Sequence, residues 1–372
     1  MPPTIDTAIK KQPPGSPMEP TNPSEWACPL PSCSQEDTIR LAHGGGGRLM
    51  QNLLQEIFLP AFSNPSLDLM QDSAVLPAPK GRLAFTTDAY VVQPLFFPGG
   101  NIGSLAVHGT INDLAMQGAV PLYLAASFIL EEGLSIETLR RIVISMAEAA
   151  TTCGIRIVCG DTKVVDRGKG DQVFITTTGI GVVKESIDFG SHRIQAGDRI
   201  LISGDLGAHG IAVLGSRQGL AFSGNLKSDS APLHEVVASL IQEGIACHCL
   251  RDLTRGGLAS ALNELASASQ TVMRLEESCI PVSDPVRGAC EILGLDPLYV
   301  ANEGRFVLIL PPDQVKPSLT ILKAHAVSQG AVEIGQVECL PEGRSPCVIL
   351  KTPFQTERML DLLSGEQLPR IC

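Results

Sequence analysis

The last residue of the chain is a cysteine, and its thiol stands where it could carry a chemical group. Cys372 follows a polar segment, 352–370, that closes with Pro369 and Arg370. Proline disfavours a helix at this point, so we expect an extended end that can swing. The tail alone also fits an exposed cysteine without a function. Acidic residues upstream favour a carrier whose cargo is modified in place.

Five aspartates share a setting that suits a magnesium nucleotide, because each ends an apolar run or lies beside glycine. They are Asp72, Asp88, Asp113, Asp161 and Asp252. Magnesium takes oxygen ligands and usually lies between a few carboxylates and substrate phosphates. A single aspartate in such a place is more often a turn former or a helix cap. As a set, the five favour a metal–nucleotide site, although spacing alone does not bring them together.

A run of four glycines, Gly44, Gly45, Gly46 and Gly47, precedes an expected helix at 49–58. Glycines allow close backbone approach, and N–H groups at a helix N-terminus can bind phosphate. The run lacks the Gly-Lys-Ser/Thr ending of a Walker A loop. A flexible entry to the fold is the competing interpretation.

Three further polar residues each have a structural and a functional interpretation. Lys163, two residues after Asp161, places a cation where phosphates would lie, but it also fits a solvated turn. Glu303 fits a turn acid before an expected strand at 305–310. His108 lies in an expected helix and favours a packed or interface histidine over a ligand.

Composition indicates a globular enzyme of mixed α and β structure. The chain has 372 residues, 44% of them hydrophobic and 4% aromatic, with 36 glycines and a net charge of -11. This length suits two domains. The acidic balance, without a basic run, argues against nucleic-acid binding. No apolar stretch reaches the ~20 residues that span a bilayer, so we expect no membrane role.

The eleven cysteines are irregularly spaced and several lie in apolar runs, which favours reduced thiols in a cytoplasmic protein. No signal peptide is expected at the N-terminus. Cys247, His248 and Cys249 form a short cluster of metal-ligand types. A second pair at zinc-finger spacing is missing, which argues against a zinc site.

Four segments are expected along the chain: a disordered Pro-rich extension at 1–36, domains at 37–190 and 191–353, and a mobile tail at 354–372. Nine of the 27 prolines lie in the first 31 residues. We predict strands at 82–86, 155–159, 173–177, 199–203, 271–275, 305–310, 331–337 and 347–351. We predict helices after Ser135 and at 208–217, 233–243, 257–268 and 286–293. Gly160 and Asp161 are expected in a turn after the strand 155–159.

Taken together, these motifs resemble the HypE family of hydrogenase-maturation proteins, within the superfamily of aminoimidazole ribonucleotide synthetase and selenophosphate synthetase. The resemblance runs from about residue 41 to Cys372. Its most specific parts are 87–92 (TDAYVV), 94–100 (PLFFPGG) continuing to 116, 160–165 (GDTKVV), 251–252 (RD), 254–257 (TRGG), 301–304 (ANEG) and 369–372 (PRIC). The PRIC ending separates the HypE family from the rest of the superfamily.

The resemblance implies a two-domain α+β, PurM-like fold, with N-terminal domains paired into a β-barrel in a homodimer and a flexible C-terminal tail. It implies ATP and Mg2+ as cofactors. The five aspartates match the magnesium-nucleotide acids, Asn112 and Lys163 would flank the phosphates, and the glycines at 44–47 would close over them. Arg48 follows those glycines where the family pattern suggests lysine, and its positive charge keeps the nucleotide role.

The implied activity is an ATP-dependent dehydration. HypF would deliver a carbamoyl group to Cys372, phosphorylation would make its oxygen a leaving group, and loss of phosphate would leave a thiocyanate for the HypC–HypD complex. Cys372, Asp113, Lys163 and Glu303 would be catalytic, with Glu303 as the base. The alternatives are another ATP-using member, such as a cyclo-ligase or a selenophosphate synthetase, or a nucleotide-switched scaffold. A selenophosphate synthetase would need a cysteine in the loop that holds His43, and none is present.

Overall fold

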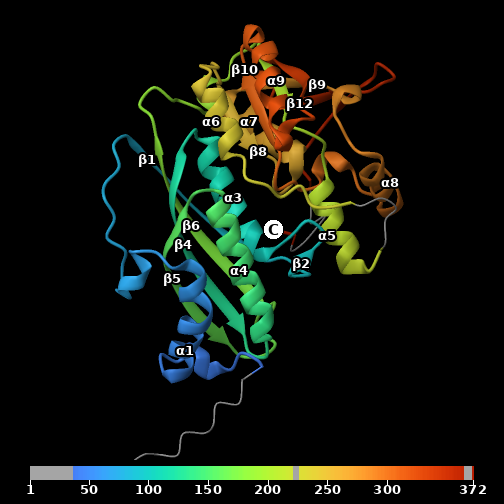
Figure 1. The fold of residues 1–372 in the computed structure, drawn as a ribbon. Helices are drawn as coiled ribbons and strands as arrows, with labels where there is room; N and C mark the ends of the chain where they lie inside the picture. Colours follow the sequence, from blue (N-terminus) through green and yellow to red (C-terminus); the bar gives the residue numbers. More distant parts are fainter. Residues whose placement is uncertain (1–36, 221–225, 364–370) are drawn as a thin grey trace, which may run out of the picture. The chain divides into compact units, whose positions relative to one another are not determined.

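The structure is a computed structural model, and it describes residues 37–220, 226–363 and 371–372. These residues belong to one compact unit, Asp37–Cys372. It contains two main sheets with helices packed on them (Figure 1). We call residues 37–190 the N-terminal lobe and 191–363 the C-terminal lobe. The extension expected at 1–36 and most of the tail end, 364–370, lie outside the described residues.

The N-terminal lobe is built on a four-stranded sheet of order β1-β6-β4-β5. The strands are β1 (Arg82–Tyr90), β4 (Val120–Glu131), β5 (Arg156–Val165) and β6 (Val173–Val183). Pairs are antiparallel except the parallel pair β4–β5. Helices α3 (Ile102–Met116) and α4 (Ile136–Thr152) belong to this lobe, and a short hairpin of β2 (Phe96–Phe97) and β3 (Gly100–Asn101) precedes α3. Burial alternates along β6, so one face of the sheet is core and the other is not.

Helix α4 shows why the sequence predicts this lobe well. Leu139, Ile142, Val143 and Met146 recur at helical spacing and are fully buried. Helix α3 packs closely against α4, and a Cβ on Gly103 would lie 2.4 Å from the carbonyl oxygen of Ile142. The first helices, α1 (Arg48–Leu53), a π-helical segment (Leu54–Phe58) and α2 (Leu59–Phe62), confirm the helix expected at 49–58.

The C-terminal lobe is built on a seven-stranded sheet of order β13-β12-β9-β11-β7-β10-β8. Its strands are β7 (Arg199–Ile202), β8 (Cys249–Asp252), β9 (Thr271–Glu276), β10 (Phe306–Leu310), β11 (Val332–Cys339), β12 (Cys347–Lys351) and β13 (Glu357–Met359). Its helices are α5 (Ala208–Gln218), α6 (His234–Gln242), α7 (Gly257–Ser269), α8 (Asp284–Leu293) and α9 (Val315–Ala324). All five residues of β10 are buried, as expected for an apolar run inside a sheet.

Most predicted strands and helices are confirmed, but two expectations are wrong and some elements were not predicted. Strand β5 continues through Gly160 and Asp161 to Val165, because these residues pair with β4 and do not form a turn. A Cβ on Gly160 would lie 2.3 Å from the carbonyl oxygen of Ala126, so glycine permits the close pairing. Strands β4 and β8 and helix α9 were not predicted. The expected tail begins within the fold, since β13 pairs with β12 and Leu360 is buried.

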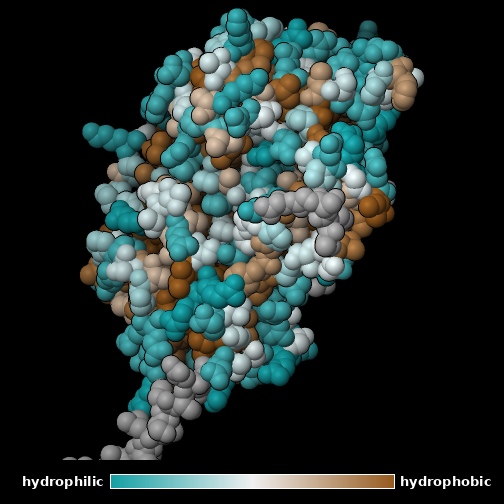
Figure 2. Space-filling view, turned by 45° about the vertical axis from the view of Figure 1, so that its right-hand side comes forward, coloured by the Kyte–Doolittle hydropathy of each residue, from teal (hydrophilic) through white to brown (hydrophobic). Residues whose placement is uncertain are grey.

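In the described parts of the chain, no helix combines the length and hydrophobicity needed to cross a bilayer. Figure 2 shows one face of the molecule, on which hydrophobic residues form small groups among hydrophilic ones.

Candidate active site

The C-terminal residue lies in the middle of the molecule, between the two lobes (Figure 1). Ile371 is buried and forms an isolated antiparallel bridge with Val92, just after β1. The N–H of Val91 donates to the main-chain carboxylate oxygen of Cys372 at 3.3 Å. From the C-terminal lobe, Nε2 of His209 lies 2.6 Å from the carbonyl oxygen of Ile371. The structure therefore shows the terminal cysteine docked inside the fold.

The docked thiol is surrounded by acidic residues of both lobes. Burial raises the pKa of Cys372 far above its usual range, and the carboxyl groups of Glu303, Asp88 and Asp252 raise it further. The guanidinium of Arg255 acts in the opposite direction. In this position Cys372 is a neutral thiol at neutral pH.

A cleft of about 1050 Å³ lies between the lobes, and its walls carry the acids next to this thiol. The N-terminal lobe contributes Asp88 from β1 and Asp113 from α3, and the C-terminal lobe contributes Asp252 from β8 and Arg255. Three of the five aspartates singled out in the sequence thus come together in space.

For two of the cleft acids, Asp113 and Asp252, the surroundings disfavour the ionised form of the carboxyl group. Thr86 donates a hydrogen bond of 2.8 Å to Asp113, but burial and the nearby Asp88 raise the pKa of Asp113. Burial, followed by the charge of Asp113, raises the pKa of Asp252 to about 6. A nearby cation would stabilise the ionised form of carboxyl groups that are crowded in this way.

Magnesium fits this donor set only together with a phosphate ligand. Among the residues that the structure describes, no group of three or more His, Cys, Asp or Glu side chains is arranged to hold a metal. Magnesium commonly uses one or two carboxylates and completes its shell with water and substrate phosphates. Asp88, Asp113 and Asp252 can supply those carboxylates, with Arg255 as an additional cation for phosphate oxygens.

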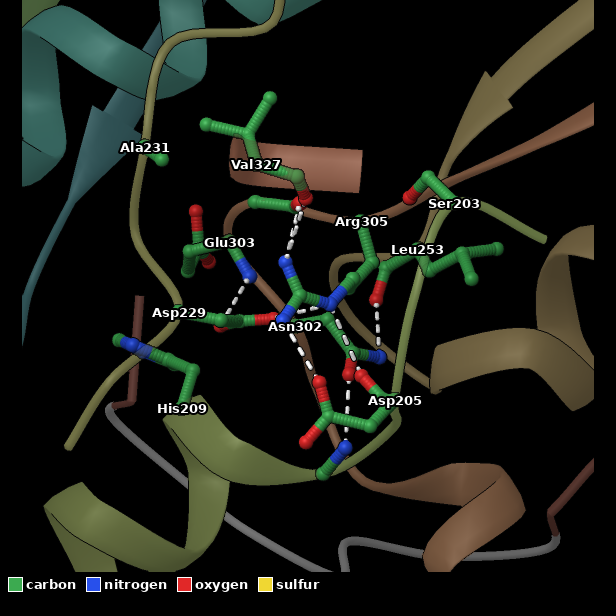
Figure 3. Close-up of polar contacts among 12 residues, drawn as sticks. Ser203, Asp205, His209, Asp229, Ala231, Leu253, Asn302, Glu303, Arg305 and Val327 are labelled. Carbon is green, nitrogen blue, oxygen red and sulfur yellow. Dashed lines mark hydrogen bonds and ion pairs between the residues drawn. The ribbon is translucent and has the colours of Figure 1, made fainter. Parts of the chain in front are cut away.

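Glu303 is buried beside this cleft, although its sequence context also fits a turn acid. Its side chain is 3% exposed, and its Oε1 atom has no hydrogen-bond partner among the described residues. Burial, Asp229 and Asp252 raise the pKa of Glu303 well above its ordinary range. Its backbone N–H donates to Asp229 at 3.1 Å, and Figure 3 shows Asp229 lying between this N–H and Arg305. Glu303 therefore carries a buried carboxyl group on an anchored backbone, and this group can exchange a proton.

Asn112 joins the lobes, which differs from the expectation that it flanks a phosphate. Its amide nitrogen donates to the carbonyl oxygens of Ala231 at 3.0 Å and Glu303 at 3.2 Å. Its amide oxygen accepts from the N–H of Leu233 at 2.8 Å. Because these protein groups occupy both ends of a buried side chain, Asn112 positions Glu303 and is not available to a phosphate in this arrangement.

The remaining predicted residues lie elsewhere on the N-terminal lobe. Along one row of paired residues, Asp161, Ser127, Thr176 and Ala89 are all exposed. In the next row, Thr162, Phe128, Ile175 and Tyr90 are all buried. Side chains alternate between the faces of a sheet, so Asp161 and Asp88 lie on opposite faces.

Lys163 shares the exposed face with Asp161, and its Nζ atom lies 3.2 Å from the Asp161 carboxylate. Asp72 and Asp161 line a separate cavity of about 220 Å³. The glycine run borders β5 as well, since a Cβ on Gly44 would lie 2.8 Å from the backbone nitrogen of Val164. Within one protomer the predicted site is therefore divided into two groups: the cleft acids Asp88, Asp113 and Asp252, and a second group along β5 that includes Asp72, Asp161, Lys163 and the glycine run.

Sequence reasoning missed His209 and Asp229, which no motif surrounds. Both are completely or almost completely buried, and Asp229 has a carboxylate oxygen without a hydrogen-bond partner among the described residues. Burial raises the pKa of Asp229 and lowers the pKa of His209. The isolated cluster Cys247–Cys249 has a structural role, since Nδ1 of His248 lies 2.8 Å from a buried Asp198 oxygen.

Comparisons with known proteins show which families and solved structures this chain resembles. Models of the N-terminal and C-terminal domains of AIR synthase related proteins match residues 70–183 and 195–344. The chain is 52% identical over 335 residues to the carbamoyl dehydratase HypE of Azotobacter vinelandii, covering 90% of this chain and 97% of that protein.

Two solved structures are similar over most of their length. The first is a crystal structure of the hydrogenase maturation protein HypE in complex with ATP: TM-score 0.85, 48% identity, 89% of this chain and 99% of that chain. The second is HypE in a HypE–HypF complex: TM-score 0.73, 43% identity, 84% of this chain and 99% of that chain.

Proposed function

The chain belongs to the HypE family of AIR synthase related carbamoyl dehydratases, and from this premise we propose that it converts a thiocarboxamide on Cys372 to a thiocyanate with ATP. The observation that carries the proposal is the docked Cys372, held beside Glu303 and the interlobe acids. A related HypE has been solved with ATP, which supports the nucleotide.

The reaction balances without an external oxidant or reductant. The carbamoyl oxygen attacks the γ-phosphorus of ATP, ADP leaves, and the nitrogen loses one proton, giving an imidoyl phosphate on the Cys372 sulfur. Removal of the second N–H proton then expels phosphate and leaves the S–C≡N group. Glu303, which is buried and has an unpartnered oxygen, is the proposed proton acceptor.

Asp88, Asp113 and Asp252 would hold magnesium against the ATP phosphates, and Arg255 would add positive charge. Magnesium, when bound, neutralises charge on the transferring phosphoryl group. We retain Asp72, Asp161, Lys163 and the glycines at 44–47 as proposed nucleotide contacts. In one protomer Asp161 and Lys163 lie on the exposed face of the first sheet, so this role depends on what covers that face.

We propose that a second copy of the chain covers it, forming a homodimeric β-barrel. Leu83 and Phe85 on β1 are 64% and 70% exposed, and they pair in register with Val182 and Ile180 on β6. Ile129 on β4 is 41% exposed. A row of apolar side chains on an otherwise regular sheet face is expected to be buried in an interface.

The tail would serve two positions, the docked one and an outward one. A related HypE has been solved in complex with HypF, which supports HypF as the donor of the carbamoyl group. We propose that HypC–HypD accepts the cyanide for the iron of a NiFe hydrogenase, and that ATP favours the docked state.

The decisive experiment follows the mass of the C-terminal peptide after carbamoylation by HypF and again after addition of magnesium and ATP. We expect a nucleotide-dependent loss of one water at Cys372. Carbamoylation without that loss would contradict the dehydratase, and no carbamoylation would contradict the carrier. Cys372→Ala should lose both mass changes, whereas Cys339→Ala, at an exposed cysteine, should keep both. A nucleotide-switched scaffold would tolerate the first variant.

A further inference from the structure

His209 is a buried imidazole that the proposed chemistry does not use, and its two nitrogens have different partners. Nε2 lies 2.6 Å from the carbonyl oxygen of Ile371, and Nδ1 lies 2.8 Å from Oγ of Ser228. A carbonyl oxygen only accepts, so Nε2 must carry the hydrogen. Nδ1 of the neutral ring then accepts from the Ser228 hydroxyl. Burial lowers the pKa of His209, which favours this neutral form.

The segment around Ser228 is itself fixed, which determines the orientation of the ring. Oγ of Ser228 accepts from the N–H of Ser230 at 3.0 Å, and the N–H of Ser228 donates to the carbonyl oxygen of Pro98 at 2.8 Å. The Phe97 ring meets the imidazole edge to face at 5.4 Å. Figure 3 shows His209 beside Asp229 at the start of α5. The Nε2–H group is therefore held in one direction, toward the carbonyl oxygen of Ile371.

We propose that His209 is the positioning residue that holds the C-terminal end in the cleft, by donating from Nε2 to the carbonyl oxygen of Ile371. This inference rests on the proposed function of the tail as a carrier. The N-terminal lobe holds the tail end through two backbone contacts, in which Val92 bridges Ile371 and the N–H of Val91 donates to Cys372. The tail end is thus held from both lobes, and the Cys372 thiol is kept next to Glu303.

This arrangement suits a contact that must form and break repeatedly. One side-chain hydrogen bond, a short bridge and one buried isoleucine hold the end, without an ion pair to the described tail residues 371–372. Loss of the Nε2–H donor would leave the Ile371 carbonyl unpaired in a buried place, which should shift the docked fraction by roughly tenfold. An exposed histidine or a surface contact would have no such effect.

The test compares His209→Asn with His209→Gln. A glutamine amide nitrogen reaches about as far as Nε2 and can donate to Ile371, whereas that of asparagine reaches only as far as Nδ1. The measurement is the iodoacetamide labelling rate of Cys372, read on the C-terminal peptide by mass spectrometry. We expect a roughly tenfold faster rate in the Asn variant and a near wild-type rate in the Gln variant. The exposed Cys279 and Cys339 serve as references within the same sample.

His325→Asn is the matched control, because Nε2 of His325 bonds Oγ of Ser239 away from the tail, and it should leave Cys372 labelling unchanged. Equal rates in the Asn and Gln variants, or no increase in the Asn variant, would overturn the proposal. If His209→Asn does not fold, His209→Met replaces it, because a thioether of similar reach fills the space but has no hydrogen to donate to Ile371. Unchanged labelling of this variant would again overturn the proposal.

Labelling is measured without ATP or carbamoylation, so it separates this inference from the proposed function. Faster labelling of the Asn variant, without water loss in the wild type, would leave the positioning role and remove the dehydratase. Unchanged labelling together with normal water loss would remove the positioning role of His209 and leave the dehydratase.

Discussion

The side-chain amide of Asn112 donates a hydrogen bond of 3.2 Å to the carbonyl oxygen of Glu303, which is 191 residues later in the chain. The first residue lies on α3, next to the cleft acid Asp113, and the second is the proposed base. One buried asparagine thus ties the wall of the nucleotide cleft to the group that would receive the proton. The contact makes the geometry of the reaction depend on how the lobes are joined.

Replacing Asn112 by alanine should therefore affect both stability and turnover. Two carbonyl oxygens and one N–H lose a hydrogen-bond partner in this variant. We therefore expect about 1–3 kcal/mol less stability and a large decrease in the ATP-dependent dehydration at Cys372. Denaturant unfolding and the peptide mass assay measure the two effects. Asn263→Ala is the control, because Asn263 bridges Ala259 and Leu360 in the C-terminal lobe. It should lose stability but keep activity, and full activity of the Asn112 variant would contradict the positioning role.

Glu303→Gln should stabilise the protein while abolishing dehydration. The folded pKa of Glu303 lies above its ordinary 4.5, so its contribution to stability is greatest below that pH and is lost as pH rises. The variant should gain at least about 1 kcal/mol over the wild type at neutral pH, and the difference should vanish in acid.

The matched control is Glu338→Gln, since its bond to Arg274 lowers the pKa of Glu338. That variant should lose stability at neutral pH. Unfolding free energies measured between pH 4 and 8 test both the predicted gain for Glu303→Gln and the predicted loss for Glu338→Gln. A Glu303 variant that is less stable at neutral pH would contradict the raised pKa of this buried carboxyl group.

The Cys372 thiol should ionise at higher pH than an ordinary cysteine thiol. Its pKa is raised above the ordinary 9.0, so docking is favoured while the thiol is neutral and weakens as pH rises past that value. Peptide-resolved alkylation across alkaline pH measures this, with Cys279 as the reference. Identical pH profiles for Cys372 and Cys279 would show that the thiol is not held in the acidic cleft.

Magnesium–ATP affinity should fall as pH drops below about 6, the pKa of Asp252. Protons and magnesium compete for the same carboxylate, so binding should release a proton in this range. Calorimetric titrations between pH 5 and 8 measure the effect. Asp252→Asn should weaken binding and flatten its pH dependence, whereas an unchanged profile would remove Asp252 from the proposed metal site.

Phe85→Glu should dissociate the proposed homodimer, because it puts a charge on the exposed apolar face of the first sheet. Sedimentation velocity gives the oligomeric state directly. Phe354→Glu is the control, since Phe354 is 89% exposed in the turn between β12 and β13, which belong to the other sheet. A monomeric wild type, or a dimer in both variants, would contradict pairing through this face.

Much of the secondary structure was predictable because its signal is local. The apolar spacing of α4 depends on residues three and four apart, and the buried run of β10 is visible within five residues. The terminal cysteine, the glycine run and the five aspartates were also evident from residue types alone. The missed strand β4 shows the limit of such signals: it holds Pro121, and only one of its faces is consistently buried.

Residue types and short-range spacing in the sequence by themselves determined the chemistry available to this protein: a terminal thiol, dispersed carboxylates and a glycine-rich entry. Tertiary structure alone decided which of these groups meet. Asp88 and Asp161 are equally suitable as ligands, but strand register places them on opposite faces of one sheet. Asn112 and His209 find partners more than a hundred residues away. Register and long-range hydrogen bonds depend on the packing of the whole chain, so no local pattern encodes them.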